Sequence, residues 1–329
     1  KPIINTNGLA LTEDLLKDLK DAGLIGVTIH IDSKQTRPKW KNKNELELNE
    51  LRLYYAEMLA SEGGMACSFN STVYGDTLHY VPELVTWAQK HIDIVHTMVF
   101  ILFRYVTPDL PFDFYADDKK ITFDEIHYHS DKEEVTNLIA PQIVAEIRKK
   151  FPDFTPAAFL NGTYEADSLK WLLTERIGTK DKIFGYMNNK FIEMVMDFYH
   201  YKNDRYLSYA SPKILSLGRA TMLNLWAINK SVRSSLKKYI GYLALNPLRV
   251  FKKVHIQSIM VIQPVDFMDN GDQSMCDGCP DITVWKDKNG KDQLVWSCRL
   301  EEPMQYGEFL HTVPKKSSSH SKNNVTGLS

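Results

Sequence analysis

The chain has 329 residues, of which 43% are hydrophobic and 25% are charged, enough apolar material for one large core or two ordinary ones. No uninterrupted apolar run approaches the roughly 20 residues that a membrane span needs, and no charged and then apolar leader opens the sequence. We therefore expect neither an integral membrane protein nor an obviously secreted one, and we expect a cytoplasmic location. Because the strand-like run Pro2 to Asn5 follows Lys1 at once, we expect the chain to begin within a domain.

Strand and helix signals alternate over the first hundred residues. We expect helices at 12–22, 45–61 and 80–90 and strands at 3–5, 26–31, 65–70 and 94–103. Strands that alternate with helices at this spacing indicate βα units around a parallel sheet, either open or closed into a barrel. The sequence therefore predicts an α/β fold for this part of the chain.

The middle of the chain is predicted to be mainly helical. Apolar residues from Val135 to Ile147 mark an amphipathic helix, and Ser168 to Arg176 and Met187 to His200 suggest two more. The segment His255 to Val265 is then strand-like.

A hairpin is predicted near the C-terminus, and a disordered tail after it. The strand-like runs Ile282 to Trp285 and Gln293 to Trp296 flank an Asn-Gly turn, which is a strong hairpin signal. From Lys315 onward the sequence lacks hydrophobic content, so we expect disorder. These signals divide the chain into four predicted ranges: 1–125, 126–254, 255–314 and 315–329.

Three of the four cysteines lie between Cys276 and Cys298, which indicates a metal or cluster site in a reducing compartment. Cys276 and Cys279 are two residues apart and can turn both sulfurs toward one metal, and the hairpin would return Cys298 to the same point. Structural zinc normally takes four protein ligands, whereas an iron–sulfur cluster can keep one iron open, so three thiolates favour a cluster. Two alternatives stay open: a zinc site completed by a residue such as His311, and three thiols without a metal.

The remaining cysteine and one pair of histidines give weaker evidence for a metal site. Cys67 lies on a predicted strand, and we expect it to be a buried structural residue. His127 and His129 could share one face as metal ligands, but spacing fixes no carboxylate or third histidine nearby. A metal role for this pair is therefore the less favoured interpretation.

Three blocks of the sequence carry a resemblance to a known family. They are INTNGLALTEDLLKDLKDAGLIGVTIHID, FNSTVYGDTLHYVPELVTWA and SMCDGCPDITVWKDKNGKDQLVWSC. In order, they resemble a strand with its helix and the next strand, a later strand with the helix that follows its loop, and the auxiliary-cluster hairpin of radical S-adenosylmethionine (radical SAM) enzymes. The likeness is to the SPASM/twitch-type group, which includes the GTP cyclase of molybdenum-cofactor synthesis and related peptide-modifying enzymes.

The resemblance implies a fold and a set of site residues. Residues 1–125 would be the C-terminal half of a radical SAM (β/α) barrel, 126–254 a helical insertion, and 255–314 the region of an auxiliary 4Fe-4S cluster. In the family, residues at the carboxyl ends of barrel strands contact the ribose and amino acid parts of S-adenosylmethionine. The matching residues here are Thr6, Asn7, His30, Asn70, Ser71 and Thr72, and the cluster ligands would be Cys276, Cys279 and Cys298.

Some of these residues also have a structural interpretation. Thr6 and Asn7 could be turn formers before Gly8, and His30, where the family usually has a smaller residue, could be a satisfied core histidine. The resemblance assigns no catalytic residue in this sequence.

The resemblance also implies an activity. The family's Cys-x3-Cys-x2-Cys loop does not occur in the sequence, and we expect it to precede Lys1. The whole enzyme would be an oxidoreductase or transferase that cleaves S-adenosylmethionine with an electron from a donor such as flavodoxin or ferredoxin. The resulting 5′-deoxyadenosyl radical would abstract hydrogen from an unknown substrate, and the chain by itself is expected to be inactive.

The formal net charge of −1 conceals a strong asymmetry, because Lys213 to Val265 contains nine Lys or Arg residues and no Asp or Glu. This stretch either pairs with the acidic remainder of the chain or faces an anionic partner. An anionic membrane surface is favoured over nucleic acid, for which no binding motif is present, so the protein could be peripheral to a membrane. A rival hypothesis is a zinc-stabilised binding or scaffold protein whose basic segment 213–253 docks on an anionic partner without catalysis.

Overall fold

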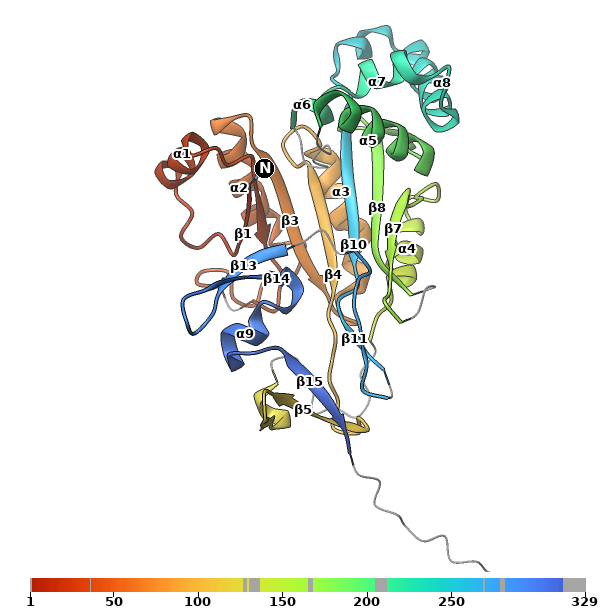
Figure 1. Ribbon diagram of the computed structural model, residues 1–329. Coiled ribbons are helices and arrows are strands. Elements are labelled where there is room, and N and C mark those ends of the chain that lie inside the picture. The colour runs from red at the N-terminus through yellow and green to blue at the C-terminus, as the bar shows by residue number, and fades with distance from the viewer. Residues whose placement is uncertain are drawn as a thin grey trace, which may run out of the picture. The chain divides into compact units, whose positions relative to one another are not determined.

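The computed structural model describes residues 2–35, 37–126, 129, 137–164, 168–204, 212–268, 270–278 and 282–315 (Figure 1). The chain forms two compact units. The first comprises Lys1–Phe103, Thr136–Pro264 and Cys276–Gly278. The second comprises Arg104–Val135, Val265–Met275 and Cys279–Ser329.

The first unit is built on an eight-stranded sheet with five parallel strands. These run side by side in the order β1 (Ile3–Thr6), β2 (Gly26–His30), β3 (Ala66–Val73), β4 (Thr97–Leu102) and β10 (His255–Ile262). Strand β8 (Leu169–Gly178) pairs with β10 in the antiparallel direction, and β7 (Ala158–Asn161) and β9 (Ile183–Tyr186) both pair antiparallel with β8. The predicted α/β class with a largely parallel sheet is confirmed. No pairing among the described strands joins β1 to β7, so this sheet is open.

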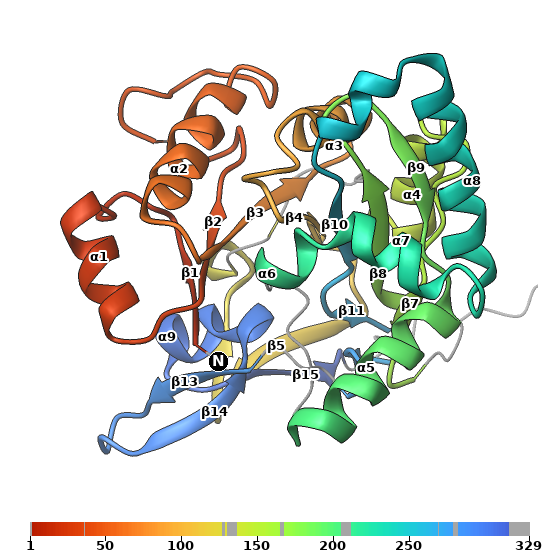
Figure 2. The same cartoon turned by 90° about the horizontal axis from the view of Figure 1, so that it is seen from above.

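Helices cover one face of this sheet. Helices α1 (Glu13–Asp21), α2 (Asn49–Glu62) and α3 (Val81–Lys90) connect β1 to β4, with a 3-10 turn η1 (Leu78–Tyr80) before α3. Consecutive parallel strands are neighbours and their crossovers are right-handed, so the connecting helices fall on the same face. Figure 2 shows α1, α2 and α3 along one side of the sheet, and α4 (Ala140–Arg148) packs into the same apolar core.

A second group of helices follows β9. It consists of α5 (Asn189–Asn203), α6 (Pro212–Leu215), α7 (Gly218–Leu225), α8 (Lys230–Leu245) and the 3-10 helix η3 (Pro247–Phe251). Asn188 and Asn229 cap the N-termini of α5 and α8 through their side-chain oxygens. A separate core forms around Phe184, Tyr239 and Tyr242. Across the described ranges, we find no helix that combines the length and the apolar character needed to cross a membrane.

The second unit consists of small sheets and short helices. The strands β5 (Phe112–Ala116), β6 (Lys119–Ile121) and β15 (Leu310–Pro314) form one sheet, and β11 (Asp266–Phe267) pairs with β12 (Gln273–Ser274). Short helices are η2 (Phe123–Glu125), η4 (Ser297–Arg299) and α9 (Glu301–Tyr306). The predicted hairpin is present as β13 (Ile282–Lys286) and β14 (Asp292–Trp296), and Gly290 at its turn has a φ of 76°.

One predicted helix is wrong. Ser168 to Arg176 was expected to be helical, but this stretch forms β8, which pairs with three other strands. Strand β8 is paired along both of its edges, and its residues Lys170 and Arg176 are fully buried. Leu, Lys, Glu and Arg have good helix propensity, but sheet pairing and burial override that local preference here.

The compact units differ from the predicted ranges. Strand β10, which begins the predicted range 255–314, lies in the first unit because it pairs with β4 on one side and β8 on the other. The described residues of the range 126–254 contain the helices α4 to α8 and η3, and they also contribute the strands β7, β8 and β9 to the same sheet. Of the predicted tail, only Lys315 lies within the described residues.

A buried ion pair holds the carboxyl end of β2 to the start of α2. The guanidinium of Arg52 donates to Glu45 Oε2 at 2.7 Å and to the backbone oxygen of Ile31 at 2.9 Å. Glu45 Oε1 accepts from the backbone N–H of Ser33 at 2.6 Å, and Oε2 from the hydroxyl of Ser71 at 3.3 Å. Arg52 and Glu45 are almost fully buried, so these contacts replace the water that both charges have lost.

Replacing Arg52 by Met should lower the free energy of unfolding by about 3–5 kcal/mol, because Glu45 would remain buried and unpaired. The double variant Arg52→Met/Glu45→Leu should lose less than Arg52→Met alone. Lys43→Met breaks the exposed pair of Lys43 with Glu47 and should change stability little. Urea denaturation of the three variants tests this, and equal losses for Arg52→Met and Lys43→Met would contradict it.

Candidate functional site

One face of the large sheet carries a row of polar side chains. Strand pairing aligns one residue from each of six neighbouring strands: Asn5, Thr28, Ser68, Thr97, Ser258 and Glu175. Their sequence neighbours Ile29, Phe69 and Met98 belong to the apolar core under the helices. Because side chains alternate across a strand, the row lies on the face away from α1 to α4.

The row ends at a buried acid. Glu175 is only 6% exposed, and its Oε1 accepts a hydrogen bond of 2.7 Å from the hydroxyl of Ser258. Within the described part of the chain, Glu175 Oε2 and Thr97 Oγ1 have no hydrogen-bond partner, although both are buried. Burial raises the pKa of Glu175 to about 7, against the opposing effect of the Ser258 hydrogen bond. This carboxyl is therefore poised to exchange a proton near neutral pH.

A second polar cluster lies at the carboxyl ends of β2 and β3. The Nε2 atom of His30 is 2.8 Å from Thr72 Oγ1 and 2.9 Å from Asp32 Oδ2. Asp32 is almost completely buried. Burial alone would raise the pKa of Asp32, but hydrogen bonds and the charge of His30 outweigh burial and lower it. Asp32 is thus held as a carboxylate next to the imidazole.

Asn70 and Ser71 are adjacent in sequence but face opposite sides of β3. Asn70 is paired with His30 in the sheet, and its Nδ2 lies 3.5 Å from Oδ1 of Asn5, on the polar face. Ser71 faces the helices, where it donates to Glu45. The structure brings together His30, Asn70 and Thr72 and separates Ser71 from them.

Thr6 and Asn7 form the turn that follows β1. The hydroxyl of Thr6 accepts from the N–H of Gly8 at 3.1 Å, and Oδ1 of Asn7 accepts from the N–H of Leu9 at 3.0 Å. Gly8 has a φ of 77°, and a Cβ there would lie 2.9 Å from the ring of Tyr55. Both side chains therefore shape the turn before Gly8, as the structural interpretation of these residues expected.

The three clustered cysteines are only partly described. Cys276 is half-buried in the first unit, where it forms an isolated bridge with Gly162. Cys298 is exposed in η4 of the second unit, and Cys279 lies outside the described residues. Among the residues that the structure describes, no group of three or more metal-ligating side chains is found. A shared site for these cysteines stays a prediction.

The other candidate ligands have structural surroundings. The ring of His311, the possible fourth zinc ligand, stacks on Tyr115 with centroids 5.9 Å apart. His129 bonds the backbone oxygen of Ile126 at 2.7 Å, and His127 lies outside the described residues. Cys67 is buried in the core, as expected, and burial raises the pKa of its thiol.

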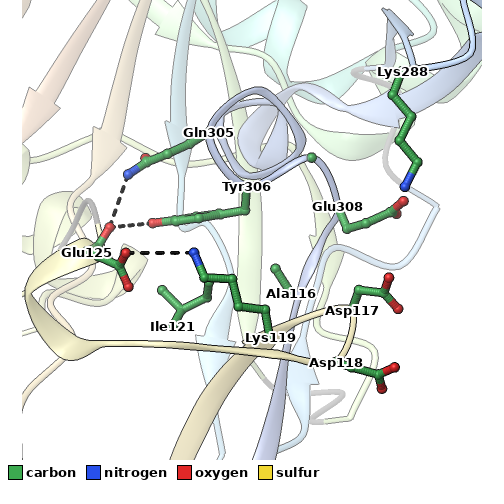
Figure 3. A pocket seen from close by; sticks show the side chains of 11 residues that line it. Ala116, Asp117, Asp118, Lys119, Ile121, Glu125, Lys288, Gln305, Tyr306 and Glu308 are labelled. Atoms are coloured by element: carbon green, nitrogen blue, oxygen red, sulfur yellow. Dashed lines mark hydrogen bonds and ion pairs between the residues drawn. The ribbon is translucent and has the colours of Figure 1, made fainter.

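A hollow of about 610 Å³ in the second unit is a weaker candidate (Figure 3). Lys119 approaches Glu125 at 4.0 Å, and both side chains are well exposed. Gln305 and Tyr306 donate to the backbone oxygen of Glu125 at 3.1 and 2.6 Å. The lining offers exposed charges and no buried ionisable group, so nothing there is desolvated for chemistry.

Sequence reasoning did not single out Asp32, Ser258 or Glu175. Asp32 follows a predicted strand directly, and a carboxylate in that place is a signal that could have found it. Glu175 and Ser258 carry no such signal, because only the long-range pairing of β8 with β10 brings them together.

Comparison of the chain with protein-family models and with curated proteins finds no match.

Replacing Glu175 by Gln should weaken the pH dependence of stability. Unfolded, this carboxyl ionises near pH 4.5, but in the folded protein it stays protonated up to about pH 7. The folded state binds more protons in between, so the contribution of Glu175 to the free energy of unfolding falls as pH rises from 4.5 to 7. Urea unfolding should show this fall reduced in Glu175→Gln by up to about 3 kcal/mol.

A second variant distinguishes this titration from a general loss of stability. In Ser258→Ala the fall should extend to higher pH, because the hydrogen bond from Ser258 favours the ionised form of Glu175. The same pH dependence in wild type and Glu175→Gln would show that this carboxyl does not titrate in the interval.

Proposed function

We propose that this chain is the part of a radical SAM enzyme that binds the nucleoside and amino acid portions of S-adenosylmethionine. The proposal rests on the polar cluster at the carboxyl ends of β2 and β3, where His30 contacts both Thr72 and Asp32. Three of the residues that the resemblance assigns to the cofactor, His30, Asn70 and Thr72, lie on the polar face of two adjacent strands. This is the edge at which parallel α/β sheets gather ligands.

The chemistry of the cluster suits a ribose. The amide of Asn70 can donate hydrogen bonds to ribose hydroxyl groups and accept hydrogen bonds from them. The contacts of His30 with Asp32 and Thr72 fix the imidazole before any ligand arrives, which lowers the entropy cost of binding. Thr6 and Asn7 contribute by holding the turn after β1 in shape.

In this proposal the open sheet is part of a radical SAM barrel. A bound 4Fe-4S cluster of the family's kind would supply the electron that cleaves S-adenosylmethionine. The residues of this chain bind and orient the cofactor. The polar row from Asn5 to Glu175 then offers hydrogen-bonding groups on the same face for a polar substrate.

Replacing Thr72 by Val should weaken S-adenosylmethionine binding about 5- to 30-fold, because it removes one hydrogen bond that holds His30, worth about 1–2 kcal/mol. Thr86→Val is the matched control, since the hydroxyl of Thr86 lies on α3 and donates to Pro82. Calorimetric titration with S-adenosylmethionine measures both affinities. Unchanged affinity in both Thr72→Val and Asn70→Ala would contradict this placement of the cofactor.

The cysteines provide a separate test. Anaerobic reconstitution of the chain should give broad visible absorbance together with bound iron, and Ala in place of Cys276, Cys279 or Cys298 should abolish both. Cys67→Ala should not, because Cys67 is buried in the core. Stoichiometric zinc without iron uptake would support the rival hypothesis of a zinc-stabilised scaffold protein.

A further inference from the structure

The basic stretch of the sequence forms one edge of the first unit. It contains α7, α8 and η3, and Figure 1 shows α7 and α8 along the upper edge of that unit. Figure 2 shows α7 and α8 next to each other from above. Their inward residues, among them Met222, Val232, Tyr239 and Tyr242, form the second core, so the basic and remaining apolar side chains face outward.

Internal pairing accounts for little of the positive charge. Lys238 pairs with Asp153 at 2.8 Å, and Lys252 pairs with Asp181. Within the described residues, the other seven basic side chains between 213 and 253 form no ion pair with an acid. Three of them, Arg219, Arg233 and Arg249, donate to backbone oxygens, and of these Arg249 also lies near enough to Asp181 to lower the pKa of that carboxyl.

The same edge exposes large apolar side chains at both ends of α8. Leu245 is 79% exposed, Leu248 72% and Phe251 82%, all within seven residues of chain. At the other end, Ile228 is 68% exposed and Trp226 48%. Isolated exposed apolar residues are common, but a close group of this kind marks an interaction surface.

The apolar group at the C-terminal end of α8 is held in a defined turn. Asn246 caps η3 by accepting from the N–H of Leu248, and Pro247 begins that helix. Arg249 donates to the backbone oxygen of Tyr242 at 3.0 Å and lies over its ring. The turn is therefore ordered while its leucine and phenylalanine side chains face water.

We propose that α7, α8 and η3 dock on an anionic lipid bilayer, with Leu245, Leu248 and Phe251 entering the headgroup region. The unpaired lysines and arginines then face lipid phosphates. A bilayer accepts projecting aliphatic side chains without a matching pocket, and its anionic lipids attract a stretch of chain that has nine basic residues and no acidic one. Nucleic acid explains the charge but gives the exposed leucines no apolar medium.

The test is cosedimentation of the protein with vesicles of phosphatidylcholine alone or with 30% phosphatidylserine. We expect binding to the anionic vesicles at about 0.05 M salt and at least a tenfold weaker affinity at about 0.5 M, because salt screens surface charges. Equal binding to both vesicles, or binding to neither, would overturn the proposal. Displacement of the protein from anionic vesicles by duplex DNA or single-stranded RNA at equal charge would do so too.

Variants separate the apolar and charged contributions. The triple variant Leu245→Ser/Leu248→Ser/Phe251→Ser and the pair Lys230→Glu/Lys237→Glu should each lose at least tenfold in vesicle affinity. The matched control is Tyr54→Ser/Phe159→Ser, which removes two aromatic side chains of 55% and 60% exposure elsewhere on the first unit. It should bind as wild type does, and circular dichroism should show that all variants fold. Wild-type affinity in the triple variant, or an equal loss in the control, would overturn the proposal.

Discussion

The ion pair between Arg52 and Glu45 joins three segments that sequence keeps apart: the end of β2, the loop before α2, and β3. Each of these segments carries a polar backbone or side-chain group that burial would otherwise leave unsatisfied. A single guanidinium and a single carboxylate satisfy these groups together. The ion pair therefore fixes the positions of the ends of β2 and β3 relative to each other. The neighbouring cluster of His30, Asp32 and Thr72 depends on that arrangement, since two adjacent strands supply its members.

The two faces of the sheet carry different kinds of side chain. On one face, alternating apolar residues such as Ile29 and Phe69 pack against the helices and supply the main core. On the other, a row of small hydroxyl and amide side chains is buried from Ser68 onward and ends at Glu175, whose charged form is disfavoured by burial. A polar face buries little apolar surface, and burying its polar groups costs free energy of folding. The apolar burial on the helix-covered face offsets that cost.

The parts of the fold that depend on local pattern could be predicted. The alternation of strands and helices up to Phe103, the helix after Asn188 and the Asn-Gly hairpin all follow from residues close together in sequence. The identity of β8 could not, because its partners β7, β9 and β10 are distant and its composition suits a helix. For the same reason Glu175 escaped notice, whereas His30, Asn70 and Thr72 were named from the resemblance, which matches them by motif position to residues at strand ends.

The place of β10 in the sheet has a consequence for synthesis on the ribosome. Strand β10 fills the gap between β4 and β8, pairing Ser258 with both Thr97 and Glu175. At about 5–20 residues per second, β4 emerges roughly 10–30 s before the strand that completes it. Until β10 emerges, the growing chain presents the unpaired edge of β4 and, once β8 has been made, an edge of β8 as well, and such edges are templates for pairing with other chains. Cotranslational protection of the β4 edge is therefore a requirement that this topology imposes on the cell.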